Sequence, residues 1–230
     1  MKIMPYGSSA LLVQMEQRID PATHDKVVRL DEAVATQNWA AVRYTIPAYC
    51  SLTIGYDPAV TAFAEMKKAV EALWAQLPPA SRRTARRIRI PVSYDDEHAL
   101  DKERIMEAAQ LEWEEVIRLH QEPVYRVYMI GFLPGFPYLG RLPEALRSKR
   151  LSVPRKRVPA LSVGLAGLQT GIYPFEAPGG WLIIGRAMAP VFEPERREPF
   201  LLRAGDEVVF VENRKDRNTA RFDYTDPPDR

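Results

Sequence analysis

The period of the hydrophobic positions changes along the chain and separates two regions. In the first region, residues 1–79, three short segments rich in β-branched and aliphatic side chains lie between polar or turn-forming residues, as is typical of strands. These predicted strands are Ala10–Met15, Val42–Ile46 and Ser51–Tyr56.

Two start signals predict helices in the same region. Asp20 and Asp57 are each followed by proline, and an aspartate N-cap with proline in the first turn is a common helix start. Beyond Asp57 an apolar stripe has helical spacing and is interrupted only by Lys67; its members are Val60, Phe63, Val70, Leu73, Trp74 and Leu77. The order strand, helix, strand, strand, helix predicts a ferredoxin-like α/β domain over residues 1–79, with helices on one face of a sheet.

The second region, residues 88–212, changes from helices to short strands. Helices are predicted over Asp101–Gln110 and Glu112–His120. The predicted strands, separated by turns rich in glycine and proline, are Ile88–Val92, Val124–Ile130, Ser162–Ala166, Trp181–Gly185 and Glu207–Val211. Many short strands with frequent turns predict a closed or nearly closed β-barrel, so the chain is expected to be α+β with two domains.

Two polar segments flank the barrel region. Residues 80–87 are predicted to be a basic linker, and residues 213–230 a polar tail that frays. Five arginines lie between Arg82 and Arg89. They could contact nucleic acid or an acidic partner, but a short basic run without aromatic stacking partners is more often simply solvated.

Composition limits the possible chemistry. The 230 residues contain 32 basic and 30 acidic side chains, so charge does not indicate a nucleic-acid or membrane partner. Cys50 is the only cysteine, which excludes an internal disulfide, and with three histidines no metal site is predicted. No apolar run reaches the ~18 residues of a spanning helix, and no secretory leader is recognisable, so a cytoplasmic location is expected.

Well-known catalytic motifs are also missing from the sequence. It contains no G-x-x-x-x-G-K-[ST] phosphate loop, no dinucleotide fingerprint and no G-x-S-x-G elbow. If the chain belongs to an enzyme, it is not one that a stand-alone catalytic motif identifies.

Three segments combine glycine, proline and aromatic residues and show neither a helical nor a strand period: 131–140, 167–174 and 178–181. Such rigid loops are predicted to converge on a cleft that binds a planar amide or carboxylate and is completed by another polypeptide. The predicted substrate-binding residues are Phe132, Pro134, Gly135, Phe136, Tyr138, Gln169, Thr170, Tyr173, Gly179, Gly180 and Trp181. The alternative is that the rings close the ends of the barrel core.

Three further residues are candidate catalytic groups. Arg186 follows a predicted strand and Arg155 lies in a basic segment; each guanidinium could hold a carboxylate or phosphate, or form only a surface ion pair. His120 ends a predicted helix and could be a general base or simply complement the helix dipole. Asp101 is predicted to be an N-cap and Asp206 a turn residue.

A family resemblance lies in segments that span nearly the whole chain. These are Ala10–Val13, Ile46–Tyr49, Tyr56–Pro58, Tyr125–Gly140, Val153–Arg155, Val158–Ala160, Ser162–Gly164, Ala166–Gly167, Gln169–Pro174, Pro178–Trp181 and Ile184–Arg186. In this order they resemble the family of 5-oxoprolinase B subunits, also called KipI-like or allophanate hydrolase subunit 1 proteins. Related segments occur in the carboxyltransferase part of biotin-dependent urea carboxylase.

The resemblance implies an N-terminal α/β domain followed by a cyclophilin-like β-barrel. It implies a B subunit that acts with a C subunit and an A subunit in the ATP-dependent opening of 5-oxo-L-proline to L-glutamate. ATP would be used by the complex rather than bound by this chain alone, and the chain alone would be inactive. Arg186 and Arg155 would then hold anions, while Gln169 and Thr170 would orient the amide.

Two other functions fit the same resemblance. A KipI-like protein inhibits a sensor histidine kinase, and related subunits belong to allophanate or urea amidohydrolases and carboxyltransferases. The chain also departs from the family pattern at Ser8, at Tyr94–Leu100, at Ala187 and at Leu161, where the family has glycine. Because leucine does not adopt a positive φ cheaply, this last change leaves the substrate open.

Overall fold

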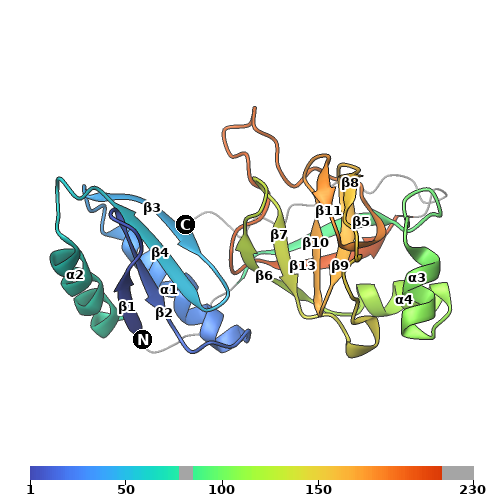
Figure 1. The fold of residues 1–230 in the computed structure, drawn as a ribbon, viewed down its shortest axis with the longest axis horizontal. Helices are drawn as coiled ribbons and strands as arrows, with labels where there is room; N and C mark the ends of the chain where they lie inside the picture. Colours follow the sequence, from blue (N-terminus) through green and yellow to red (C-terminus); the bar gives the residue numbers. More distant parts are fainter. Residues whose placement is uncertain (78–84, 214–230) are drawn as a thin grey trace. The chain divides into compact units, whose positions relative to one another are not determined.

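The computed structural model describes residues 1–77 and 85–213. Contacts divide the chain into two compact units, residues 1–84 and 85–230 (Figure 1). Most of the predicted linker, residues 80–84, and the predicted tail from residue 214 lie outside the described residues. The predicted α+β class with a β-barrel is confirmed.

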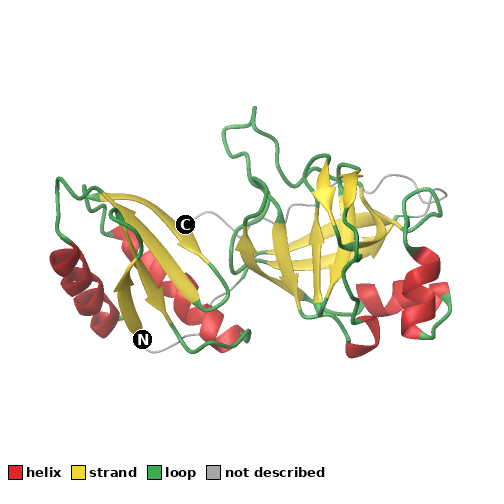
Figure 2. Cartoon of the chain, in the orientation of Figure 1, coloured by secondary structure: helices red, strands yellow, loops and turns green. Residues whose placement is uncertain are grey.

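The first unit is a four-stranded antiparallel sheet with both of its helices on one face (Figures 1 and 2). The sheet order is β1-β2-β4-β3. β2 and β3 run parallel on either side of β4, which is the split arrangement of a ferredoxin-like layer. The elements are β1 (Lys2–Pro5), β2 (Ala10–Gln14), α1 (Pro21–Thr36), β3 (Val42–Pro47), β4 (Ser51–Tyr56) and α2 (Phe63–Gln76).

β1 was not expected, and it takes the edge position that a strand after α2 would occupy in the usual ferredoxin order. The start of α1 is as expected, because Asp20 Oδ1 accepts hydrogen bonds from the N–H groups of Ala22 and Thr23. No helix within residues 1–77 or 85–213 is long and apolar enough to cross a membrane.

The predicted start of the second helix after Asp57 is wrong. Asp57 instead closes a turn, in which its Oδ1 accepts from the Ala59 N–H at 2.9 Å and its carbonyl oxygen accepts from the Thr61 N–H at 3.2 Å. α2 begins six residues later, and Val60 is exposed outside it. Met66, not Lys67, supplies the buried position of the apolar stripe.

The second unit contains a closed barrel that seven strands form in the described part of the chain, in the order β10-β7-β6-β13-β5-β12-β9 (Figure 2). β5 and β13 pair in parallel and the other neighbours are antiparallel. The strands are β5 (Arg87–Ser93), β6 (Tyr125–Ile130), β7 (Pro137–Gly140), β9 (Ser162–Ala166), β10 (Gln169–Ile172), β12 (Leu182–Ala187) and β13 (Glu207–Glu212). Outside the barrel are α3 (Lys102–Ala109), α4 (Trp113–Gln121), the short 3-10 helix η1 (Glu144–Leu146), β8 (Arg155–Val158) and its partner β11 (Ala177–Gly179).

The three glycine-proline-aromatic segments are therefore not only loops. β7, β10 and β11 arise from them, and each is three or four residues long. Strands this short do not show a period. β10 and β11 are also held by strands from distant segments, β7 and β8, which local patterns do not reveal.

Strands of the barrel contribute to two separate apolar clusters. Leu182 and Ile184 of β12 lie in the barrel core, whereas Ile183 lies in a second cluster with Phe136, Val158, Ala166, Tyr173, Ala177 and Trp181. Because successive side chains of a strand point to opposite faces, the second cluster lies on the outer face of the barrel strands, beside β8 and β11. The predicted candidate residues fall on both faces.

Candidate functional site

Five aromatic rings from all three of the predicted loop segments meet on this outer face. Phe136 lies at the centre, with ring centroids 4.9 Å from Tyr138, 5.2 Å from Tyr173 and 5.4 Å from Trp181, all in edge-to-face arrangements. Phe132 packs on Phe136 at 5.6 Å. The structure thus brings segments 131–140 and 167–181 together. We call these five residues the aromatic cluster.

Most of the aromatic cluster is packed rather than open. Phe136, Tyr173 and Trp181 are 1%, 1% and 6% exposed, whereas Phe132 is 61% exposed. The alternative that the rings close the ends of the barrel core does not describe them, because the three buried rings belong to a separate cluster outside the barrel core. Phe132 also has φ of 70°, a conformation that a bulky residue rarely adopts without a compensating reason.

Pro134 and Gly135 shape the loop that carries Phe132. The Phe136 N–H donates to the Leu133 carbonyl at 3.0 Å, and Gly135 has φ of 83°. Proline followed by a residue with positive φ is the pattern of a type II turn. The predicted rigidity of this segment therefore has a local cause.

Gly179 permits a close approach inside the cluster. A Cβ at this position would lie 2.3 Å from the Tyr173 hydroxyl, so only glycine fits. At Gly180 the nearest atom, on Pro154, would be 3.6 Å away, which is ordinary contact. Of the three predicted glycines, Gly135 and Gly179 are required by packing and Gly180 is not; a Cβ at Gly135 would lie 2.4 Å from Phe192.

The two predicted amide-orienting residues point to different sides of β10. Thr170 is fully buried and its hydroxyl lies 3.2 Å from His120 Nε2, on the inner side. Gly171 contacts Phe136 on the outer side, so the half-buried Gln169 shares the face of the aromatic cluster. The structure brings Gln169, but not Thr170, to that cluster.

His120 lies inside the unit. Its Nδ1 is 2.8 Å from the Tyr94 hydroxyl, its ring stacks on Phe210 at 4.7 Å, and it has no exposed surface. Burial lowers the pKa of His120 to about 3, so the ring is neutral at ordinary pH. This environment argues against proton transfer to a substrate and also against a charge that complements the dipole of α4.

Asp101 precedes α3, but the expected side-chain cap is absent. Its buried carboxylate instead accepts from Arg155 Nη2 at 2.7 Å and from the Ile183 N–H at 2.7 Å. Asp101 thus occupies the N-cap position as expected, but its carboxylate is used by these two donors and does not cap the helix. Nη2 of the Arg155 guanidinium is therefore bound to a buried acid.

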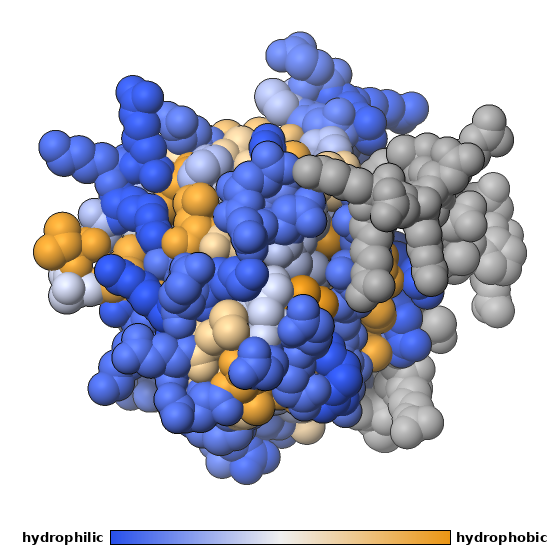
Figure 3. Space-filling view, turned by 90° about the vertical axis from the view of Figure 1, so that its right-hand side faces the viewer, coloured by the Kyte–Doolittle hydropathy of each residue, from blue (hydrophilic) through white to orange (hydrophobic). Residues whose placement is uncertain are grey.

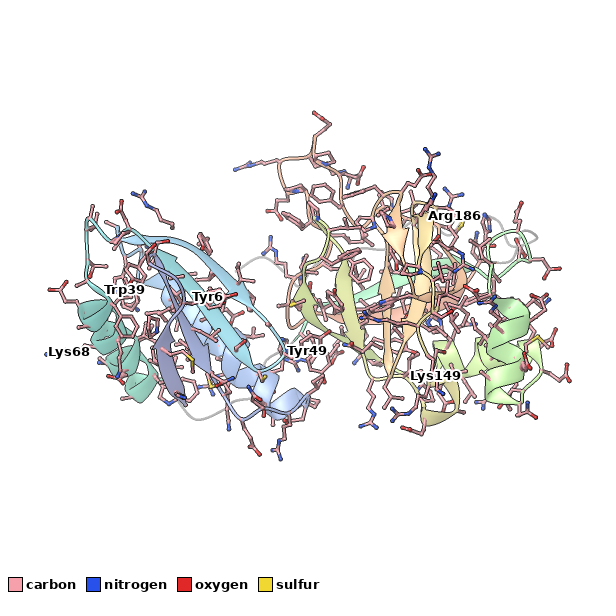
Figure 4. The ribbon with its side chains drawn as sticks, in the orientation of Figure 1. Tyr6, Trp39, Tyr49, Lys68, Lys149 and Arg186 are labelled. Atoms are coloured by element: carbon pink, nitrogen blue, oxygen red, sulfur yellow. The ribbon has the colours of Figure 1, made fainter. Side chains whose placement is uncertain are left out.

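Arg186 lies near the end of β12, half-buried, with its backbone in register with Ser93 and Ser162. No ion pair of Arg186 is found within residues 1–77 and 85–213, in contrast to the surface-pair alternative. Figure 4 shows Arg186 and Lys149 far apart on the second unit. Arg186 is therefore a cation still able to bind an anion.

Two interactions were not foreseen near the predicted linker. Asp206 is buried, and its carboxylate accepts from Arg86 Nε at 3.1 Å and from the Arg203 N–H at 2.8 Å. Arg87 pairs with Glu207 and begins β5. Asp206 is thus more than a turn residue, and two of the predicted linker arginines hold β5 to β13.

The face that carries α3 and α4 is mainly hydrophilic (Figure 3). It contains a groove of about 1120 Å³ that is rich in acidic side chains: Asp95, Asp96, Glu97, Glu114, Glu122 and Glu212. Asp95, Glu97 and His98 offer ligand atoms within 4.8 Å of one another, but both acids are exposed and His98 Nδ1 contacts Ser93 Oγ at 2.9 Å. The acidic run Asp95–Glu97 was the available sequence signal for this groove.

Comparison with known proteins gives a consistent family. Residues 1–202 match the family described as carboxyltransferase domain, subdomain C and D. The B subunit of 5-oxoprolinase from Bacillus subtilis is 37% identical over 220 residues, covering 91% of this chain and 92% of that protein. The B subunit of 5-oxoprolinase from Haemophilus influenzae is 47% identical over 149 residues, or 65% and 70% of the two chains.

A solved structure has the same fold. The crystal structure of TTHA0988 superposes with a TM-score of 0.80 at 36% identity and covers 89% of this chain. This chain spans 40% of the length of TTHA0988. The same module is therefore joined to further polypeptide in that protein.

Proposed function

This chain belongs to the carboxyltransferase domain, subdomain C and D, family, and we propose that it is the B subunit of a 5-oxoprolinase. The observation that carries the proposal is the similarity, over nearly the whole chain, to relatives of that name. The reaction would be the ATP-dependent opening of 5-oxo-L-proline to L-glutamate. The chain would act in a hetero-oligomer with a C subunit and an A subunit.

The chemistry explains why cationic side chains matter. The carbonyl of an unactivated lactam resists attack by water, and phosphorylation of its oxygen creates a good leaving group. Fixed cations stabilise the charge that develops in such a step. Arg186 and Arg155 are the candidates in this chain, since one lacks a described ion pair and the other has a guanidinium arm beyond its acid.

The described helices do not suit the phosphates of ATP. A helix N-terminus binds phosphate when its first N–H groups are free and no anion competes. Asp20 caps α1, Glu65 lies in the first turn of α2, Glu103 in that of α3, and Glu114 in that of α4. This supports placing ATP on another polypeptide of the complex or on a site shared with one.

The geometry of the aromatic cluster supports dependence on a partner. Its inner rings are packed, and only Phe132 exposes a large apolar surface. A site with one exposed ring does not enclose a small substrate, which normally loses most of its surface to the pocket. A second polypeptide would supply the missing wall, and the fusion of this module to further polypeptide in TTHA0988 is consistent with that.

Reconstitution tests the proposal. The chain mixed with the A and C subunits is expected to turn over 5-oxo-L-proline only when ATP is present, and Arg186→Ala is expected to abolish this activity. Arg157→Gln is the matched control, because Arg157 is exposed and its ion pair among the described residues is with exposed Glu176. Turnover by the chain alone, or full activity of Arg186→Ala, would contradict the proposal.

A further inference from the structure

A buried acid links three elements beside the aromatic cluster. The Asp101 side chain is 1% exposed, and both of its oxygens accept hydrogen bonds, from Arg155 of β8 and from Ile183 of β12. The Asp101 N–H donates in return to the Ile183 carbonyl at 3.0 Å. This reciprocal pair of bonds fixes the carboxylate on β12, and the carboxylate fixes the guanidinium.

The guanidinium retains a buried donor with no acceptor. Among the described residues, Arg155 Nη1 has no hydrogen-bond partner although it is shielded from solvent. A guanidinium cannot lose its charge, and a buried donor without an acceptor costs free energy. The side chain as a whole is nevertheless 26% exposed, so the guanidinium lies near solvent although Nη1 itself is covered.

The surroundings of Arg155 are cationic. Arg155 pairs in register with Gly179, against which the Tyr173 hydroxyl lies. Arg150 stacks over the Trp181 ring at 5.9 Å, and both arginines act to lower the pKa of Tyr173, although burial raises it overall. Residues 145–175 contain six basic and no acidic side chains. Asp101 pairs with Arg155, Glu144 with Arg147 and Glu176 with Arg157, so three acids face six cations and the region still attracts anions.

We propose that Arg155 Nη1 binds an oxygen of a small acidic ligand, a carboxylate or a phosphate, and that Asp101 is the residue that positions it. This inference rests on the proposed function, because 5-oxoproline has a carboxylate and its activated form a phosphate. Asp101 itself does not touch the ligand. It holds one arm of the guanidinium, so that the other arm is oriented before the ligand arrives.

Titration of the full-length chain tests the ligand. The side-chain NMR signals of Arg155 are followed while 5-oxo-L-proline, inorganic phosphate or 2-pyrrolidinone is added. The first compound has a carboxylate and a lactam, the second only an oxyanion and the third only a lactam. We expect the Arg155 signals to shift with 5-oxo-L-proline, with phosphate, or with both, and not with 2-pyrrolidinone.

Asp101→Asn tests the positioning role. The Kd of the acidic ligand is expected to rise at least tenfold, because the neutral amide no longer holds the guanidinium, while Arg157→Gln on the same strand leaves the Kd unchanged. Arg155→Lys is the second variant, since lysine keeps a charge for Asp101 but lacks the second arm. It should lose ligand binding while its melting temperature stays close to that of wild type.

Three results would overturn the inference. They are no Arg155 shift with either acidic ligand, an unchanged Kd in folded Asp101→Asn, and a crystal soak that shows only an ordered water at Nη1. An inactive reconstituted complex together with a clear Arg155 shift would instead reject the proposed function and leave the oxyanion site in place. An active complex in which Asp101→Asn keeps the wild-type KM would support the proposed function and reject the positioning role of Asp101.

Discussion

Acidification is expected to destabilise the second unit through His120. The folded-state pKa is about 3 and the ordinary value is 6.5, so between these values the unfolded chain binds a proton that the folded chain does not. Stability is therefore fully present above pH 6.5 and is lost as the pH falls toward 3. The slope is about 1.4 kcal/mol per pH unit, and the whole effect is at most about 5 kcal/mol.

Chemical denaturation between pH 7 and pH 5 measures this effect. Carboxylates elsewhere also titrate in acid, so the quantity of interest is the gap between wild type and His120→Gln. Glutamine keeps hydrogen-bonding groups for Tyr94 and Thr170 but cannot be protonated. The wild-type protein should lose about 2 kcal/mol relative to this variant between pH 6.5 and pH 5.

Thr170→Val is the control for this measurement. It removes the hydroxyl that faces His120 Nε2 and leaves the ring in place, so its stability deficit should vary little with pH. A gap between wild type and His120→Gln that stays constant from pH 7 to pH 5 would refute the reasoning. It would mean that the ring is solvated or charged in the folded state.

Three further substitutions test the packing of β11 and the ion pairs at β5 and β13. Gly179→Ala should lower stability by about 1–3 kcal/mol, seen as a lower denaturation midpoint, because its Cβ would meet the Tyr173 hydroxyl at 2.3 Å; a wild-type midpoint would show that β11 adjusts freely. Arg86→Ala should cost about 2 kcal/mol because it removes a partner of buried Asp206. Arg87→Ala, which breaks an exposed pair, should cost less than about 1 kcal/mol, and equal costs for the two variants would contradict this difference.

Local patterns in the sequence located most regular elements of both units. Three of the four strands of the first unit, β2, β3 and β4, and the helices α3 and α4 were found because their side chains have a period and their ends have recognisable residues. Asp20 caps α1 as expected, whereas the identical Asp57-Pro58 signal forms a turn. An aspartate followed by proline suits both structures. The start of α2 is set further along, where Glu65 accepts from the Ala62 N–H and where Met66 and Val70 are buried.

The candidate site was less predictable, because its geometry depends on contacts between distant residues. That the aromatic segments meet could be anticipated from composition, but not that Phe136, Tyr173 and Trp181 would be buried in a cluster of their own. Asp101 and Arg155 are 54 positions apart, so nothing in either neighbourhood indicates their pairing. At Leu161, by contrast, the backbone could be anticipated. The family has glycine at this position, and the leucine here adopts a φ of 65°, in the region that favours glycine.

β12 connects the stability of the barrel with the orientation of the candidate groups. Leu182 and Ile184 hold the strand in the core, Ile183 binds Asp101 through its backbone, and Arg186 follows near the end. The register with β9 shifts between Ile183 and Gly185, which changes the spacing between these groups relative to a regular strand. Arg155, through Asp101, and Arg186 are thus both oriented by one strand. A core substitution that moved β12 would therefore disturb both cations together, although neither belongs to the core.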